Sequence, residues 1–236
     1  MNNLSDLDIN TLKEHNILIT NELLTKLNDG YPLQYVVGDA IFYGYKYFVN
    51  ENVLIPRFET EQLIEQVLNK NFKINKVLDL CSGSGVIGLT LANLTNAYVD
   101  MVEVSHEANE VCKRNIKLHH LENKINLIEQ DLFKYQIEDC YDLIISNPPY
   151  LTHQDKVSPN TRFEPDMALY SDEDPIKYYK YIIDQVALLN NYKLVAFEIG
   201  EEEADDIIFY AKSKNINNIS VKKDYNDKDR FIFILK

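Results

Sequence analysis

From Lys76 onward the sequence alternates between short apolar runs and segments with helical spacing, and this alternation restricts the possible folds more than any other feature. Parallel strands need a crossover between them, which is usually a helix. The predicted strands are residues 76–80, 97–104, 124–129, 141–146 and 193–199, and the predicted helices are 85–94, 106–119, 175–190 and 201–213. The pattern therefore predicts a doubly wound, Rossmann-like α/β sheet that is mostly parallel.

The end of the chain departs from this alternation. Two further strands are predicted at residues 217–223 and 229–235, joined by the short stretch "DYNDKD". A connection of this length cannot hold a crossover helix, so the two strands must form an antiparallel hairpin. A mostly parallel, seven-stranded sheet that ends in an antiparallel hairpin is the outline of the class I methyltransferase fold.

Two smaller units are predicted before this sheet. Residues 1–31 form a short helical region with two helices, the first capped by Ser5 and the second by Thr20 or Asn21. Residues 32–70 hold a β-hairpin at 41–55 and a connecting helix with Pro56 near its start and Glu59 and Thr60 in its first turns. Residues 71–236 form the main domain.

Amino-acid composition limits which binding partners and which cellular compartment we expect for this protein. Of the 236 residues, 45% are apolar, and no window resembles a membrane span or a signal peptide, so we expect a cytoplasmic protein with no membrane partner. The net charge is −13, and no basic cluster is denser than Lys222-Lys223, so no direct nucleic-acid partner is expected. Cysteine and histidine spacing predicts neither a disulfide nor a metal site.

A glycine-rich window follows the first strand of the main domain. The stretch "GSGVIG" contains Gly83, Gly85 and Gly88, matches G-x-G-x-x-G, and opens a predicted helix. Glycines let the backbone approach a ligand, and a helix N-terminus offers free N–H groups. The residues expected to contact a cofactor here are Cys81, Ser82, Gly83, Ser84 and Gly85.

Acidic residues near the strand ends indicate which cofactor binds. Asp79 lies four residues before Gly83, where a carboxylate would repel the pyrophosphate of NAD but would suit the cationic S-adenosyl-L-methionine. Glu103 ends the second strand, where an acid can bind ribose hydroxyls of either cofactor. Asp131 follows the third strand and either accepts from an adenine amine, with Leu132 packed on the ring, or caps a loop.

The stretch "YDLIISNPPYL" places Asn147, Pro148, Pro149 and Tyr150 directly after a buried strand. The prolines stiffen this rim and carry no N–H, so their carbonyls stay free. Asn147 Oδ1 and the Pro148 carbonyl can accept from the two N–H bonds of an amide or amine nitrogen and stabilise positive charge as that nitrogen is methylated. Tyr150 can stack over a planar group. We predict catalytic roles for Asn147, Pro148 and Tyr150, substrate binding by all four residues, and a contact of Asn147 with the cofactor as well.

With these residues in place, the chain resembles the HemK/PrmC family, the methyltransferases that modify the glutamine of the Gly-Gly-Gln motif in peptide chain release factors. The segments that carry the resemblance are "PLQYVVGDAIFYGYKYFVNENVLIPRFETEQLIE", "FEPDMALYSDEDPIKYYKYII", "AFEIG" and "KDYNDKDRFIF". The resemblance implies an S-adenosylmethionine-dependent protein-glutamine N5-methyltransferase that acts on class I release factors. Cys81-Ser82 replaces the usual glycine and threonine, and about thirty residues precede the match where members usually have several helices.

Parts of the sequence are also compatible with other functions. Adenine amino-methyltransferases of DNA or RNA share the Asn-Pro-Pro-Tyr motif but need a basic face or a recognition domain. A protein that keeps cofactor binding without catalysis would be expected to lose Asn147 or the glycines, which are present. Phe42 is expected to pack in the hairpin. Arg57 and Glu59 form either a structural ion pair or part of the site. The stretch "IPRFET" is expected to line the entrance of the site.

Overall fold

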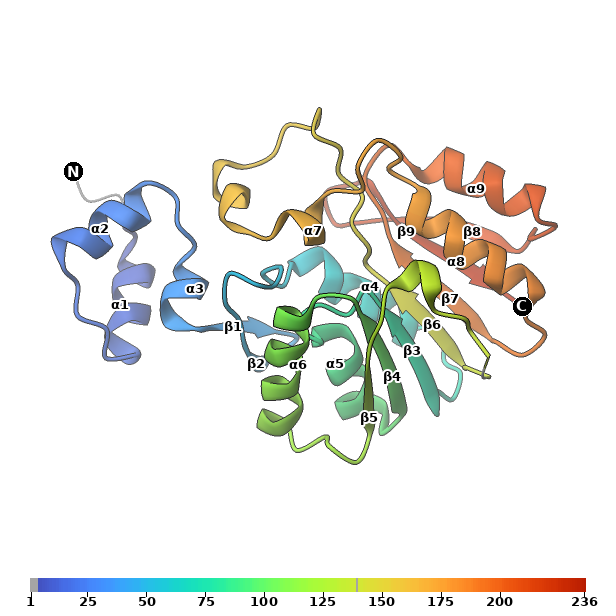
Figure 1. Cartoon of the computed structure of the whole chain (residues 1–236), viewed down its shortest axis with the longest axis horizontal. Helices are drawn as coiled ribbons and strands as arrows, with labels where there is room; N and C mark the ends of the chain where they lie inside the picture. Colours follow the sequence, from blue (N-terminus) through green and yellow to red (C-terminus); the bar gives the residue numbers. More distant parts are fainter. Residues whose placement is uncertain (1–3, 139) are drawn as a thin grey trace.

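The computed structural model describes residues 4–138 and 140–236, and most of them surround one seven-stranded sheet (Figure 1). The strand order is β5-β4-β3-β6-β7-β9-β8. All neighbouring strands are parallel except β9, which pairs antiparallel with both β7 and β8. The bounds are β3 Lys76–Leu80, β4 Tyr98–Glu103, β5 Ile125–Glu129, β6 Leu143–Ser146, β7 Leu194–Glu198, β8 Ile219–Lys223 and β9 Asp229–Leu235. The predicted fold class and its C-terminal hairpin are confirmed.

Helices cover both faces of this sheet, which explains why most residues of its central strands are apolar. On one face the core contains side chains of α4 (Phe58–Leu68), α5 (Val86–Thr95) and α6 (His106–Leu118). On the other face it contains side chains of α8 (Lys177–Leu188) and α9 (Ala204–Ser213). Every residue of β6 and β7 is buried, as expected for strands covered on both sides.

The sheet reverses its winding between β3 and β6. From β3 the chain continues to β4 and β5 on one side, and β6 then returns to pair with β3 on the other. In open α/β sheets, ligands bind outside the carboxyl ends of the strands at such a reversal. The predicted site residues follow β3, β4, β5 and β6, so the topology gathers them at one edge.

The N-terminal helices lie at the opposite end of the molecule from α8 and α9 (Figure 1). Helix α1 (Asp6–Glu14) is capped by Ser5, and α2 (Asn21–Asn28) by Thr20, as predicted. The hairpin is shorter than the predicted 41–55, with β1 at Asp39–Phe42 and β2 at Tyr45–Phe48. Tyr43 and Gly44 have positive φ angles of 51° and 77°, as a two-residue hairpin turn requires.

Several short elements were not predicted. Helix α3 (Leu33–Val37) precedes the hairpin, and the short helices η1 (Leu132–Lys134), η2 (Pro159–Phe163) and α7 (Asp166–Leu169) lie in the connections after β5 and β6. These elements have five residues or fewer, too few for an apolar repeat to be recognised. Among the described residues, no helix is both long and apolar enough to cross a membrane.

Candidate active site

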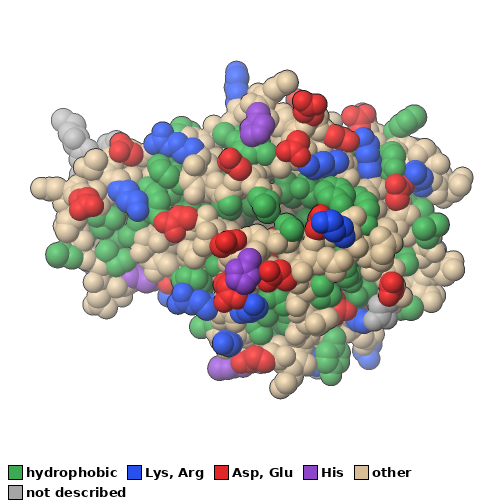
Figure 2. Space-filling view, in the orientation of Figure 1, with side chains coloured by type: hydrophobic (Ala, Val, Ile, Leu, Met, Phe, Trp, Pro, Cys, Tyr) green, Lys and Arg blue, Asp and Glu red, His purple; other side chains and the backbone are tan. Residues whose placement is uncertain are grey.

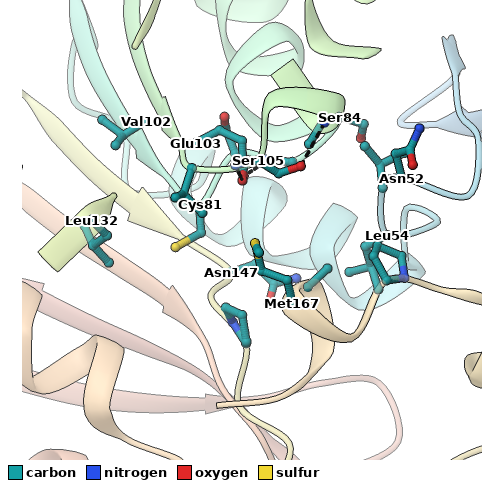
Figure 3. Close-up of a pocket in the computed structure, with 18 of the residues that line it drawn as sticks. Asn52, Leu54, Cys81, Ser84, Val102, Glu103, Ser105, Leu132, Asn147 and Met167 are labelled. Carbon is teal, nitrogen blue, oxygen red and sulfur yellow. Dashed lines mark hydrogen bonds between the residues drawn. The ribbon is translucent and has the colours of Figure 1, made fainter. Parts of the chain in front are cut away.

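A cavity of about 370 Å³ opens at the carboxyl ends of β3, β4, β5 and β6. Figure 3 shows Glu103 and Ser105 on one side of it, Asn147 and Met167 opposite, Leu132 at one end and Asn52 and Leu54 at the other. The predicted residues that line it are Cys81, Ser82, Gly83, Ser84, Glu103, Asp131, Leu132, Asn147 and Pro149. Residues predicted from four separate strand ends therefore share one cavity.

The glycine loop wraps the start of α5 closely against β3 and α6. Gly85 has a φ of 84°, and a Cβ there would approach Cys112 Sγ to 2.6 Å. A Cβ on Gly88 would approach Met101 Cε to 2.6 Å, so this glycine permits close contact between helix and sheet. Gly85 itself is not among the residues that line the cavity, whereas its neighbours Ser84 and Val86 are.

Cys81 occupies an unusual backbone conformation at the start of this loop. Its φ is 61°, in the left-handed region that costs a side-chain-bearing residue about 1–2 kcal/mol. Its side chain lines the cavity, and in Figure 3 its sulfur points to the side of the cavity where Leu132 lies. Cys81 stands where the resembling family usually has glycine, and its positive φ angle is one that glycine adopts without strain.

The carboxylate of Glu103 holds two loops together at the cavity wall. Its Oε2 accepts from the N–H of Gly83 and its Oε1 from the N–H of Ser105, each at 2.9 Å. The side chain is mostly buried, and this burial raises the pKa of its carboxyl group. Glu103 is thus both a ligand candidate and a brace between the loops after β3 and β4.

Asp79 does not line the cavity, contrary to the prediction that it meets the cationic end of the cofactor. It is fully buried beneath the glycine loop, where its Oδ2 accepts from the N–H of Gly88 at 2.9 Å. Burial raises its pKa to about 8. Ser82 and Gly83 line the cavity and Asp79 does not, a difference that spacing along the sequence does not reveal.

Asp131 and Leu132 reach the cavity from the loop after β5. Asp131 Oδ1 accepts from the N–H of Phe133 at 3.0 Å and caps η1, so the capping interpretation is correct for this oxygen. The residue still lines the cavity together with the buried Leu132. Both of the roles left open for Asp131 are therefore compatible with its position.

Asn147 lies between this cavity and a second, smaller one of about 170 Å³. Pro149 lines the larger cavity, whereas Pro148 and Tyr150 line the smaller one. Tyr150 is therefore turned away from the predicted cofactor and faces the second cavity. The Asn147–Tyr150 rim lies between two cavities and contributes residues to both.

Some residues of the site were missed or wrongly paired. Met167 of α7, Tyr178 of α8 and Asn52, in the segment predicted as hairpin, also line the larger cavity. Arg57 does not pair with Glu59 but with the buried Glu164, which also accepts from the N–H of Ile55 at 3.1 Å. Two parts of the "IPRFET" stretch, Pro56 and Thr60, line the cavity as expected.

Phe42 behaves as the packing interpretation predicts. Its side chain is 1% exposed and meets the ring of Tyr47 edge to face within the core. It is not among the residues that line either cavity. Within the part of the chain that the structure describes, no group of three or more histidine, cysteine or acidic residues is placed to hold a metal ion.

The donor and acceptor groups of the larger cavity suit a nucleoside with an amino-acid tail. The buried hydroxyl of Ser82 lines the cavity and has no protein partner, so a ligand can satisfy it. Glu103 offers carboxylate oxygens for ribose hydroxyls, and Leu132 offers an apolar surface for a base. These groups fit S-adenosylmethionine, and no basic side chain is among the lining residues to favour a pyrophosphate.

The fold and the cavity define a class I S-adenosylmethionine-dependent methyltransferase, and a model of the family described as "Methyltransferase small domain" matches residues 58–163. Release factor glutamine methyltransferases of Flavobacterium psychrophilum and Bacillus anthracis are each 36% identical over 225 residues. The alignments cover 89% and 90% of this chain, and 77% and 79% of the relatives. The chain belongs to the release factor glutamine methyltransferase family.

Solved structures share the fold at lower sequence identity. The catalytic domain of human METTL16, determined with a MAT2A 3′UTR RNA hairpin, superposes with a TM-score of 0.68 at 14% identity. The superposition covers 91% of this chain and 90% of that domain. At this identity, the likeness supports the class I architecture alone.

Proposed function

We propose that this protein transfers a methyl group from S-adenosylmethionine to the side-chain amide nitrogen of the glutamine in the Gly-Gly-Gln motif of class I peptide chain release factors. Family membership supports the reaction and the substrate. The observation that carries the site assignment is the position of Asn147, which borders both the larger cavity and the smaller one. A residue in this position can touch a substrate in one space next to a cofactor in the other.

The larger cavity is the proposed cofactor site. S-adenosylmethionine supplies, when bound, an activated methyl carbon, and the amide nitrogen that receives it loses one proton to solvent. Glu103, Ser82 and Leu132 are proposed to hold the nucleoside. Asp79 supports the glycine loop from behind through Gly88.

The smaller cavity is the proposed site of the glutamine side chain. An amide nitrogen is a poor nucleophile because its lone pair is delocalised into its carbonyl. Acceptors on its two N–H bonds orient it and stabilise the positive charge that develops on it. Asn147 Oδ1 and the Pro148 carbonyl are proposed as these acceptors, with Tyr150 packed against the planar amide.

Charge does not favour a nucleic-acid substrate. On the face drawn in Figure 2, lysine and arginine side chains are interspersed with aspartate and glutamate, with no continuous basic surface among the residues described there. The net charge of −13 agrees with this distribution. Proteins that hold nucleic acid by its phosphates concentrate basic residues on one face. We therefore propose a protein substrate.

Mass spectrometry tests the proposal directly. An intact class I release factor incubated with the protein and S-adenosylmethionine should gain one methyl group, located by fragmentation on the glutamine of Gly-Gly-Gln. A release factor with that glutamine replaced by asparagine is the matched control and should gain none. Methylation of adenine in RNA or duplex DNA, with none on the release factor, would contradict the proposal.

A further inference from the structure

We propose that Thr60 and Glu198 position the side-chain amide of Asn147, turning its oxygen towards the substrate, and that Glu198 must be ionised to do so. This inference rests on the proposed function and assigns to that site a pair of positioning residues and a dependence on pH. Thr60 belongs to the first turn of α4, and Glu198 is the last residue of β7. Neither was identified as part of the reaction from the sequence.

The three side chains form a chain of hydrogen bonds. Asn147 Nδ2 donates to Thr60 Oγ1 at 3.2 Å, and Thr60 Oγ1 donates to Glu198 Oε2 at 2.7 Å. Thr60 is 3% exposed and Glu198 is 2% exposed, so water competes little for these groups. Because β6 and β7 are paired neighbours, their ends bring Asn147 and Glu198 close together.

The direction of this chain depends on the single proton of the Thr60 hydroxyl. A carboxylate can only accept, so ionised Glu198 takes the Thr60 proton and leaves the Thr60 oxygen as an acceptor. Thr60 then binds the NH₂ group of Asn147, and the Asn147 oxygen faces outwards. A protonated Glu198 can donate to Thr60, whose hydroxyl is then free to donate to the Asn147 oxygen and turn the NH₂ group outwards.

The orientation matters because the two ends of the amide are chemically opposite. An outward oxygen accepts an N–H bond of the substrate amide, as the proposed reaction requires. An outward NH₂ group presents N–H donors to N–H donors and repels the same substrate. The ionisation state of Glu198 therefore selects between a productive and an unproductive form of Asn147.

The surroundings of Glu198 place this change near neutral pH. Burial raises its pKa to about 7, opposed by the hydrogen bond from Thr60, the charge of Arg230 and the contact with Asn147. Glu59 of α4 raises it further. The other titratable groups around it are Tyr179 of α8, whose hydroxyl donates to the Glu198 carbonyl, and Tyr150. Arg57 lines the smaller cavity together with Glu198, and Glu203 lies near the same two tyrosines.

Two replacements of Thr60 distinguish the effect of its hydroxyl on Asn147 from the effect of its side-chain shape on packing. Thr60→Val keeps the shape of the side chain but removes the hydroxyl, so single-turnover methylation of the release factor at saturating cofactor should fall about tenfold to a hundredfold. Thr60→Ser keeps the hydroxyl and should restore most of the rate. Because Thr60 also lines the proposed cofactor cavity, saturating cofactor in both assays keeps any change in cofactor affinity out of the comparison. Equal rates in the valine and serine variants would overturn the proposal.

The pH profile tests the role of the Glu198 charge. In the wild-type protein the single-turnover rate should fall as pH drops below about 7, up to tenfold per unit. Glu198→Gln cannot ionise, so its rate should be lower and nearly constant from about pH 6 to 8. An acid limb that persists unchanged in a folded Glu198→Gln variant would overturn the proposal.

An NMR titration tests the coupling between Glu198 and Asn147 without an assay of methylation. In the wild-type protein alone, NMR should show the carboxyl carbon of Glu198 and the side-chain NH₂ of Asn147 shifting with one common midpoint. Thr60→Val should markedly reduce the shift of the Asn147 NH₂ signal at the Glu198 midpoint, and independent midpoints in the wild type would refute the coupling. A wild-type protein that shows the coupled titration but does not methylate release factors would refute the proposed function and leave the positioning network intact.

Discussion

The carboxylate of Glu103 accepts a hydrogen bond from the N–H of Gly83 at 2.9 Å, which ties the end of β4 to the glycine loop after β3. The same carboxylate accepts from Ser105 at the start of α6. One side chain therefore links two loops that line the cavity and also offers oxygen atoms to a ligand. Its replacement should affect cofactor affinity by both routes.

We expect Glu103→Ala to weaken binding of S-adenosylhomocysteine by about 1–3 kcal/mol, because ribose hydroxyls lose a charged acceptor. Isothermal titration calorimetry measures this change. Glu103→Gln is the matched control, since it keeps the shape and one acceptor and should lose less. Unchanged affinity in the alanine variant would place the ribose contact elsewhere.

Asn147→Ala should reduce methylation of the release factor by a factor of about 10² to 10³, because it removes one acceptor next to the reacting nitrogen. The residue lies on the rim beside two cavities, so the fold should persist. Single-turnover kinetics at saturating cofactor, with circular dichroism as a check of folding, give the measurement. Near-normal turnover would show that Asn147 does not act as an acceptor.

Cys81 offers a test of backbone strain. Its φ of 61° costs any residue with a Cβ, so Cys81→Gly should be more stable than Cys81→Ala by roughly 1 kcal/mol. The two variants both lose the sulfur, which makes their difference a measure of the backbone alone. Equilibrium urea denaturation compares them, and an alanine variant at least as stable as the glycine variant would argue against strain at this position.

Asp79 should make stability depend on pH. Its pKa in the folded protein, about 8, lies above its ordinary value of 3.8, so the folded state prefers the protonated form. The stability that Asp79 contributes is therefore fully present below about pH 4 and is lost as pH rises towards 8.

The Asp79→Asn variant isolates this effect, since it keeps an acceptor for the N–H of Gly88 but cannot ionise. From pH 5 to 8, the free energy of unfolding of the wild type should fall relative to the variant, with each unit of pKa shift worth about 1.4 kcal/mol. Denaturation at several pH values measures the difference. Parallel curves for the two proteins would mean that Asp79 titrates normally.

The sequence by itself determined the sheet, its order of elements and the edge that carries the site. These features follow from local patterns: apolar runs that stop at Gly83 or Asn147, and helical spacing between them. Backbone geometry links such patterns to structure directly, because strand ends in a parallel sheet share one edge. The glycine window and the Asn-Pro-Pro-Tyr rim were identified in this way.

Only the tertiary structure decided which side chains meet. Thr60 and Asn147 are 87 residues apart, and Thr60 and Glu198 are 138 apart, so no local pattern could pair them. Arg57 and Glu164 are likewise far apart in the sequence, and no local pattern could pair them. Asp79 was predicted to line the cavity, but its side chain is fully buried. Such contacts depend on how helices and loops pack over the sheet, because hydrophobic packing is set by shape and total volume rather than by spacing along the chain.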